Sequence, residues 1–204
     1  MATITQRVVR NARRRGLTVL TRPQWGSRYG SVYVWRRLFK RAHQPADTVV
    51  QHITVTFDSG KLVGDFKTDM RTIERIGYER FKSGFSYNFA VDMRDGTIGV
   101  GQPLDAKGTH TVNDKNVRGF SRDQNLRARA IAVIGMPGDQ LSKDAEAAIV
   151  QLLAAMVDEG AVTPGFDYEP HSKFAYKDCP CGPTRDRMPA IRAAVNKAVR
   201  RPKR

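Results

Sequence analysis

The strongest structural signal in this chain is a segment dominated by β-branched residues. Residues 48–57 read TVVQHITVTF, and Val, Ile and Thr favour strands because their side chains fit a pleated, half-buried surface. A second buried strand is predicted at 128–136, ARAIAVIGM. Between them, residues 86–104 form two predicted strands around Asp95-Gly96, a pair that favours a hairpin turn. The chain must therefore build a β-sheet and cover its apolar faces with other elements.

Segments that can cover such a sheet lie on both sides of these strands. Residues 67–82 carry apolar side chains at helical spacing. Ser142 is suited to cap a helix from 143 to about 159. Two basic helices are predicted near the ends of the chain, at 5–15 and 185–200. Strands that alternate with helices predict an α/β fold with a mixed central β-sheet flanked by helices.

Two long segments lack a regular hydrophobic period. Residues 105–127 are polar and rich in Gly, Asn, Asp and Arg, and a loop of this length inside a compact domain is usually functional or mobile. Residues 162–183 contain four prolines and are predicted to be mostly irregular.

The positive charge of the chain is concentrated at its two ends. Residues 1–46 contain eleven Lys or Arg and no acidic residue, and residues 185–204 carry +7. Because the whole chain of 204 residues carries +15, residues 47–184 carry −3. We therefore expect a central domain at 47–184, whose start extends into the basic segment 1–46, and a basic C-terminal helix and tail at 185–204. Basic ends indicate a polyanionic partner, such as a wall polymer, nucleic acid or an anionic membrane.

Several classes of protein are excluded by what the sequence lacks. Apolar runs stay well short of the roughly 20 residues that a membrane helix needs, and no secretory signal is visible. The only cysteines, Cys179 and Cys181, are separated by one residue, and a disulfide across that spacing would be strained. At least one of the two thiols is therefore a ligand or a small buried residue.

The candidate metal ligands are few, because the chain has four histidines and two cysteines. His52 lies in the strongest predicted strand, while His171 and Cys179 lie in the proline-rich segment, eight residues apart. That spacing is not one of the short zinc-finger spacings. On pattern alone, the favoured interpretation of each of these residues is a satisfied histidine or a small buried thiol.

A series of short motifs in one order makes the metal-site reading specific. They are Arg22-Pro23-Gln24-Trp25-Gly26-Ser27, Val49-Val50-Gln51-His52-Ile53-Thr54, Ser86-Tyr87-Asn88-Phe89-Ala90-Val91, Arg94-Asp95-Gly96-Thr97-Ile98, Lys107-Gly108-Thr109-His110, Ala130-Ile131-Ala132-Val133, and His171 with Lys177-Asp178-Cys179-Pro180. Over about 22–183, this order resembles the type 2 N-acetylmuramoyl-L-alanine amidases, a family that includes phage amidases, bacterial wall amidases and animal peptidoglycan recognition proteins.

The resemblance implies a zinc enzyme that cleaves bacterial peptidoglycan. It assigns His52, His171 and Cys179 as Zn²⁺ ligands, a set that suits zinc and leaves a fourth position for water. Zinc lowers the pKa of bound water to about 7, which would allow attack on the amide between N-acetylmuramic acid and L-alanine. By the same resemblance, Lys177 stabilises the oxyanion, and Tyr87 positions water or substrate.

The resemblance also implies that His110 lines the substrate groove. The alternative is that His110 is a loop histidine exposed to water. The sequence departs from the family at Ile53 and Asn88, where a histidine is common. Neither position is a predicted ligand, so the zinc site is retained. Cys181 competes with Cys179 as a ligand, but only Cys179 directly precedes the proline of the motif.

Two other functions fit parts of the sequence. A non-catalytic peptidoglycan-binding module of the same fold typically lacks a zinc ligand, commonly the cysteine, whereas this chain has all three candidates. A nucleic-acid-binding protein would use the basic ends, but these lack the regular aromatic residues that stack on bases. We therefore expect a monomeric endolysin or virion-borne lysin whose partners are peptidoglycan and, through its basic ends, anionic wall polymers. It would be made in the host cytoplasm and reach the wall after release.

Overall fold

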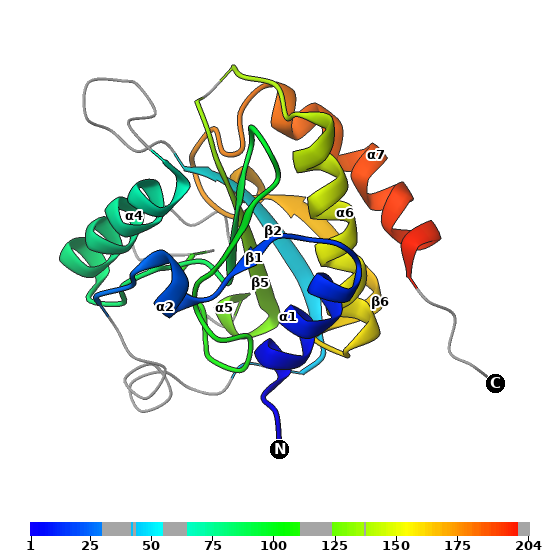
Figure 1. Cartoon of the computed structure of the whole chain (residues 1–204). Coiled ribbons are helices and arrows are strands. Elements are labelled where there is room, and N and C mark those ends of the chain that lie inside the picture. Colours follow the sequence, from blue (N-terminus) through cyan, green and yellow to red (C-terminus); the bar gives the residue numbers. More distant parts are fainter. Residues whose placement is uncertain (30–41, 43, 55–64, 111–123, 137, 200–204) are drawn as a thin grey trace.

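The computed structural model describes residues 1–29, 42, 44–54, 65–110, 124–136 and 138–199. Three predicted features fall partly outside these residues: the end of the first strand at 55–57, most of the polar loop at 105–127, and the last residues of the basic tail. Within the described residues, a central sheet has helices on both faces (Figure 1). This is the α/β architecture predicted from the sequence.

The sheet has six strands in the order β1-β4-β3-β5-β2-β6. Their bounds are β1 Val19–Leu20, β2 Ala46–Thr54, β3 Phe89–Asp92, β4 Ile98–Val100, β5 Ala128–Ile134 and β6 Val162–Pro170. The predicted hairpin is confirmed, since β3 and β4 pair antiparallel. The other neighbouring strands run parallel, so the sheet is mixed.

The four long helices α1, α4, α6 and α7 begin close to where the sequence predicts them, whereas the short α2, α5 and η1 lie in segments that were not predicted to be helical. They are α1 Ile4–Arg14, α2 Arg22–Trp25, α4 Phe66–Phe81, α5 Gln124–Arg127, α6 Lys143–Asp158, the 3-10 turn η1 His171–Lys173 and α7 Pro183–Ala198. The predicted cap of α6 is confirmed, because the Ser142 hydroxyl accepts a hydrogen bond from the Ala145 amide at 3.0 Å. Such a bond satisfies one of the amides left unpaired at a helix start.

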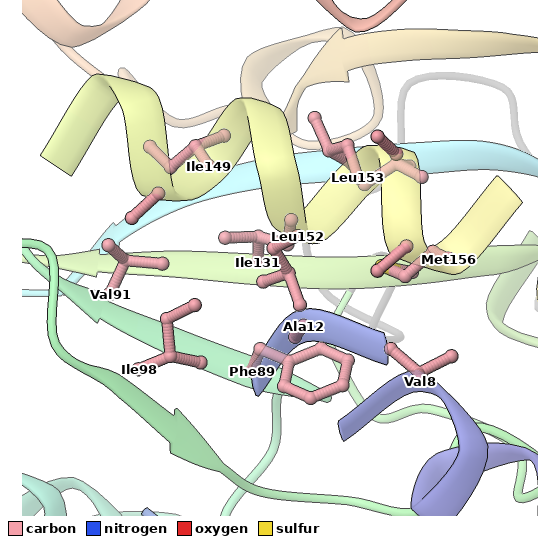
Figure 2. Packing of buried hydrophobic residues seen from close by; sticks show 14 of the residues in the cluster. Val8, Ala12, Phe89, Val91, Ile98, Ile131, Ile149, Leu152, Leu153 and Met156 are labelled. Carbon is pink, nitrogen blue, oxygen red and sulfur yellow. The ribbon is translucent and has the colours of Figure 1, made fainter. Parts of the chain in front are cut away.

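One face of the sheet packs against α1, α6 and α7 to form the main core. Figure 2 shows Ile149, Leu152 and Leu153 of α6 over Val91 and Ile131 of the sheet. Helix α1 adds Val8 and Ala12, and α7 adds Ile191 and Val195 to the same buried cluster. Both basic helices are thus held by apolar side chains, although the domain boundaries at 47 and 185 stay predictions.

The opposite face of the sheet packs against α4 and α2 through a smaller cluster. Phe66, Met70 and Ile73 of α4 contact Ala90 and Ile134, and the buried ring of Trp25 completes the cluster. This face is therefore covered at one end by α4, and the candidate functional residues lie on the remainder.

Strand β5 separates the two faces by side-chain size. Ile131 and Val133 point into the main core, and since side chains alternate along a strand, Ala128, Ala130 and Ala132 point to the other face. Ala128 belongs to a separate cluster there, with Val50 and Phe174. The small alanine side chains leave room for the larger polar residues of the neighbouring strand.

The prediction that residues 162–183 are mostly irregular is wrong for the first part of that range. Residues Val162–Pro170 form β6, which pairs in parallel with β2. A register shift between Ala46 and Thr48 accommodates the segment that contains Pro164 and Gly165. Proline is tolerated because β6 has a neighbour on one side only, so the prolines that indicated irregular structure mark an edge strand.

No helix in the described ranges combines the length and the apolar character that crossing a bilayer requires.

Candidate metal centre

His52 lies near the end of β2, on the face of the sheet that α4 partly covers. It pairs in register with Ala132 of β5, a residue small enough to leave space for the imidazole. The side chain is buried, at 1% exposure, and its Nε2 atom has no hydrogen-bond partner among the described residues. A buried polar atom without a partner is unfavourable, so this nitrogen is a candidate for binding a ligand that the protein itself does not supply.

His171 reaches the same place because β6 runs beside β2. Gln51 pairs with Pro170, so the residues that follow them, His52 of β2 and His171 at the start of η1, come side by side. Their ring centroids are 4.3 Å apart. The strand that the sequence did not predict is therefore the element that positions the second histidine.

Cys179 comes from the loop that follows η1. This loop is closed by a backbone hydrogen bond of 2.6 Å from the Ser172 amide to the Cys179 carbonyl. The Cys179 Sγ atom also accepts a hydrogen bond from the backbone amide of Ile53, at 3.5 Å. The thiol is thereby attached both to the turn that carries His171 and to the strand that carries His52.

The structure brings together the three residues predicted as metal ligands. One ligand atom from each of His52, His171 and Cys179 lies within 4.8 Å of the others. Cys181 is not a member of this group. Two imidazoles and one thiolate are donors that Zn²⁺ prefers, and three protein ligands leave a position for water or substrate.

The protonation behaviour of these residues fits a metal site. Burial lowers the pKa of His52 well below its usual value, and the positive charges of His171, His110 and Lys177 lower it further. The imidazole therefore stays neutral, which is the form that binds metal. Burial raises the pKa of the Cys179 thiol to about 11, partly opposed by the Ile53 amide. A divalent cation would deprotonate that thiol, so the residues present fit zinc.

Tyr87 lies two residues before the start of β3, next to the candidate ligand His52. Its ring centroid is 4.8 Å from that of His52. Burial raises the pKa of its hydroxyl, and the nearby Cys179 raises it further. The phenol therefore keeps its proton and is available as a hydrogen-bond donor.

His110 is packed edge-on against His52, with ring centroids 5.5 Å apart. It is 6% exposed, so the alternative of a water-exposed loop histidine is wrong. Burial lowers its pKa to about 3, helped by the charges of His171 and Arg129, while a hydrogen bond to the Ala128 backbone acts in the opposite direction. A neutral third imidazole thus stands beside the group of three.

Lys177 is exposed, two residues before Cys179. Its positive charge lowers the pKa of both His52 and Cys179, which puts the ammonium group within electrostatic reach of the centre.

The two departures from the family pattern have structural explanations. The Asn88 side chain donates hydrogen bonds to the carbonyls of Gln102 and Pro103, at 3.2 and 3.3 Å, and accepts one from the Ala130 amide at 2.8 Å. It joins three backbone segments and is not a member of the candidate ligand group. At Ile53, the contact with Cys179 is made by the backbone amide, which any residue except proline would provide at this position.

The first of the sequence motifs, at residues 22–27, has a structural role. Glu74 of α4 is fully buried and accepts hydrogen bonds from Arg22, from the Ser27 hydroxyl and from the Arg28 amide, at 3.0, 2.5 and 2.8 Å. The Trp25 indole donates to the Val100 carbonyl at 2.9 Å. The motif thus attaches α2 to α4 and to the sheet.

Sequence reasoning missed Arg129, which is fully buried within β5. Its guanidinium donates to the carbonyls of Leu126 and Ala128, at 3.3 and 2.9 Å, and its charge acts on His110. Burial lowers the pKa of Arg129 to about 10, opposed by Asp105 and Asp47. The available signal was an arginine inside a strand of apolar residues, a residue type that is seldom buried without partners.

Comparisons of the sequence give no match, neither with a model of a protein family nor with a curated protein. Solved structures do match. Drosophila PGRP-LB superposes with a TM-score of 0.66 at 21% identity, over 86% of this chain and 92% of that one. The Clostridium intestinale endolysin LysCS, an N-acetylmuramoyl-L-alanine amidase, superposes with a TM-score of 0.59 at 21% identity, over 88% and 95%.

A third structure shows a related protein with a bound ligand. Peptidoglycan recognition protein LE, in complex with tracheal cytotoxin, a monomeric diaminopimelic acid-type peptidoglycan, superposes with a TM-score of 0.64 at 20% identity, over 86% of this chain and 93% of that one. These likenesses span most of each chain. This chain therefore shares the fold of these peptidoglycan recognition proteins and of this endolysin N-acetylmuramoyl-L-alanine amidase.

Proposed function

We propose that this protein is a zinc-dependent amidase that hydrolyses the bond between N-acetylmuramic acid and L-alanine in bacterial peptidoglycan. The observation that carries the proposal is the meeting of His52, His171 and Cys179, whose ligand atoms lie within 4.8 Å of one another. The fold shared with an endolysin amidase supports the choice of reaction. The bound peptidoglycan fragment in a protein of the same fold supports the choice of substrate.

In this proposal His52, His171 and Cys179 hold the zinc ion. When bound, zinc would act as a Lewis acid and make water a stronger nucleophile at neutral pH. The protein would hold the ligands in place through the sheet: the Ile53 amide orients the sulfur, and burial keeps His52 neutral. Fixing ligands through neighbouring groups is a general property of metal sites.

Three further residues would act on the substrate. Tyr87, kept protonated by burial, would donate a hydrogen bond that orients the scissile amide or the attacking water. Lys177 would stabilise the negative charge that develops on the amide oxygen. His110 would line the groove as a neutral side chain. The excess charge at the basic ends would concentrate the protein on anionic wall polymers.

The proposal includes a biological setting. We infer an endolysin, or a lysin carried in a virion, that acts on the cell wall after release. The likeness to the LysCS endolysin supports this setting. A peptidoglycan-binding protein without activity is the second candidate, since recognition proteins share the fold. The presence of all three candidate ligands favours the enzyme.

The products of wall digestion test the proposal. Purified walls treated with the zinc-loaded protein should release new amino-terminal L-alanine and no new reducing sugar. New reducing ends would instead identify a glycosidase. Binding to walls without any new termini, in a preparation with one zinc per chain, would identify the binding module. The Cys179→Ser variant serves as the matched control, because the smaller, harder oxygen is a poor zinc ligand in this set.

A further inference from the structure

A small surface cavity of about 190 Å³ lies between α4 and the residues that follow α2, where these two helices lie next to each other (Figure 1). Neither the candidate metal ligands nor Lys177 belongs to its lining, so it is separate from the centre described above. The residues of α4 in the lining share one face of that helix, because positions three and four apart lie above one another. The lining includes Arg28, Tyr29, Thr68, Arg71, Thr72 and Arg75.

The lining of this cavity is positively charged. Its three arginines are accompanied by one acid, Glu74, which leaves a net charge of +2. Glu74 is fully buried and is already paired with Arg22 at 3.0 Å, a residue outside the lining. Arg71 and Arg75 are four residues apart on one helix, and like charges at that spacing repel each other. An anion bound between them would relieve that repulsion.

Two of the arginines are positioned by hydrogen bonds. The Arg71 guanidinium donates to the Trp25 carbonyl at 3.2 Å and to the Thr68 hydroxyl at 2.9 Å, which uses two of its five N–H donors. The backbone amide of Arg28 donates to Glu74 at 2.8 Å, and its exposed guanidinium has no partner among the described residues. Guanidinium groups match the geometry of phosphate, and groups held in place lose less entropy on binding.

The third arginine is also available to a ligand. Arg75 is paired with Glu79 across 3.3 Å, but both side chains are more than half exposed. Such a pair contributes little free energy, so Arg75 can turn towards an anion at small cost. The hydroxyls of Thr68 and Thr72 line the same cavity and add O–H donors. Three cations and two hydroxyls therefore surround a space that suits an anion rich in oxygen atoms.

The size of the cavity and the state of its aromatic neighbours restrict the ligand. Pockets for drug-sized ligands hold about 300–1,000 Å³, so this smaller space suits a phosphate group with a short polyol attached. Tyr29 is stacked on Tyr78, with ring centroids 4.7 Å apart, and Lys82 Nζ lies 5.3 Å from the centroid of the Tyr78 ring. Single-stranded nucleic acid is bound by rings on which bases can stack. Because these two rings are stacked on each other, a polymer without bases is the better fit.

We propose that this cavity binds a phosphate group of an anionic wall polymer made of polyol phosphates. The inference goes beyond the proposed amidase function, because binding here requires neither zinc nor peptidoglycan. The site differs from the basic ends of the chain in having a defined place, between α2 and α4. A polymer offers many equivalent phosphates to one cavity, which raises their effective concentration. The cavity would thereby keep the protein at the wall.

A titration with sn-glycerol 3-phosphate, followed by amide NMR of the zinc-loaded chain, tests the site. The largest shifts should occur at Arg28, Thr68 and Thr72, and glycerol should cause none. Arg28→Gln should weaken binding about 5-fold, the upper range for an exposed ion pair, without lowering the melting temperature. Arg10→Gln, the same change at an exposed position of α1, should leave the affinity unchanged. Equal weakening by both variants, or shifts confined to residues near Cys179, would overturn the inference.

Polymers then identify the source of the phosphate. A glycerol phosphate oligomer should bind more tightly than the monomer, and Arg28→Gln should weaken that binding. Single-stranded DNA with the same number of phosphates should bind more weakly. Tighter binding of the DNA, lost in Arg28→Gln, would identify a nucleic-acid site and overturn the inference.

One further variant separates this inference from the amidase proposal. His52→Ala removes a candidate zinc ligand and should leave the affinity for glycerol phosphate unchanged. Phosphate binding by this variant would support the site even if the native chain cleaves no peptidoglycan. A native chain that cleaves walls but binds neither the monomer nor the oligomer would overturn the site and leave the amidase proposal intact.

Discussion

The backbone amide of Ile53 donates a hydrogen bond to Cys179 Sγ across 3.5 Å, and Ile53 directly follows His52 in β2. Consecutive residues of one strand therefore supply a candidate ligand and the donor that fixes another candidate ligand from a distant loop. Since amide hydrogen bonds favour the charged form of a thiol, the strand prepares the sulfur for a cation. Any shift of β2 would displace both ligands together.

Removing any one of the three candidate ligands should eliminate both zinc and activity. We expect His52→Ala, His171→Ala and Cys179→Ala each to bind less than one tenth of the zinc of the native chain, roughly the loss expected when one of three ligands is removed. Elemental analysis and wall-turbidity assays would measure the two losses. His110→Ala is the control and should retain one zinc per chain. Full lysis by any ligand variant would refute the assignment.

Removing the metal should destabilise the folded chain. A ligand present at 100 times its dissociation constant adds about 2.7 kcal/mol to the free energy of unfolding. A strong chelator should therefore lower the melting temperature and abolish lysis, and added Zn²⁺ should restore both. The Cys179→Ala variant should show no change on chelation. A chelator effect of the same size in that variant would mean that the metal binds elsewhere.

Substitutions of Lys177 and Tyr87 should lower the catalytic rate more than they lower the stability of the fold. Lys177→Ala is expected to lower kcat by about 10²- to 10³-fold, as for other groups that stabilise an oxyanion. Its melting temperature should stay close to that of the native chain, because the side chain is exposed. Tyr87→Phe should lower kcat by about tenfold or more, the value of one hydrogen bond to a charged group. Stopped assays with soluble muramyl peptides, together with melting curves, would separate the two effects.

The stability of the metal-free protein should fall in mild acid. The fold lowers the pKa of His110 from 6.5 to about 3, so within that window the unfolded chain binds a proton that the folded chain does not. Stability therefore rises with pH across the window and declines as the pH falls below 6.5. Urea unfolding from about pH 7 to about pH 4 would measure the slope. His110→Gln should reduce it, and an unchanged slope in that variant would contradict the argument.

Glu74 of α4, which accepts hydrogen bonds from the motif at residues 22–27, should be more sensitive to substitution than an exposed acid on the same helix. It is fully buried and paired with Arg22, so Glu74→Gln leaves a buried charge without its partner and should cost about 3 kcal/mol of unfolding free energy. Glu79→Gln breaks the exposed pair with Arg75 on the same helix and should cost less than about 1 kcal/mol. Denaturant unfolding would compare the two. Similar losses would show that Glu74 does not anchor α2.

The sequence was most informative where one physical requirement dominates the choice of residues. The β-branched run in β2 and the apolar run in β5 have to be strands inside a covered sheet, and both were predicted. The sequence was least informative at β6, because an edge strand needs fewer ladder hydrogen bonds and admits Pro164 and Gly165. Composition alone does not distinguish such a strand from a loop.

The candidate metal centre was also only partly predictable from the sequence. His52, His171 and Cys179 were identified through the order of motifs, since their separation along the chain carries little information. The contribution of Ile53 was not predictable, because a backbone amide has no sequence signal. Arg129 was overlooked because its role depends on which groups surround it after folding.

Because small and large side chains alternate along β5, its register with β2 cannot shift without disrupting the packing on both faces of the sheet. If the strand slipped by one residue, Ile131 and Val133 would crowd the histidines, and Ala130 and Ala132 would leave holes beneath α6. Mutations that enlarge the alanines should therefore damage the centre without touching a ligand. Those that shrink the isoleucine or the valine should loosen the protein while the centre keeps its shape.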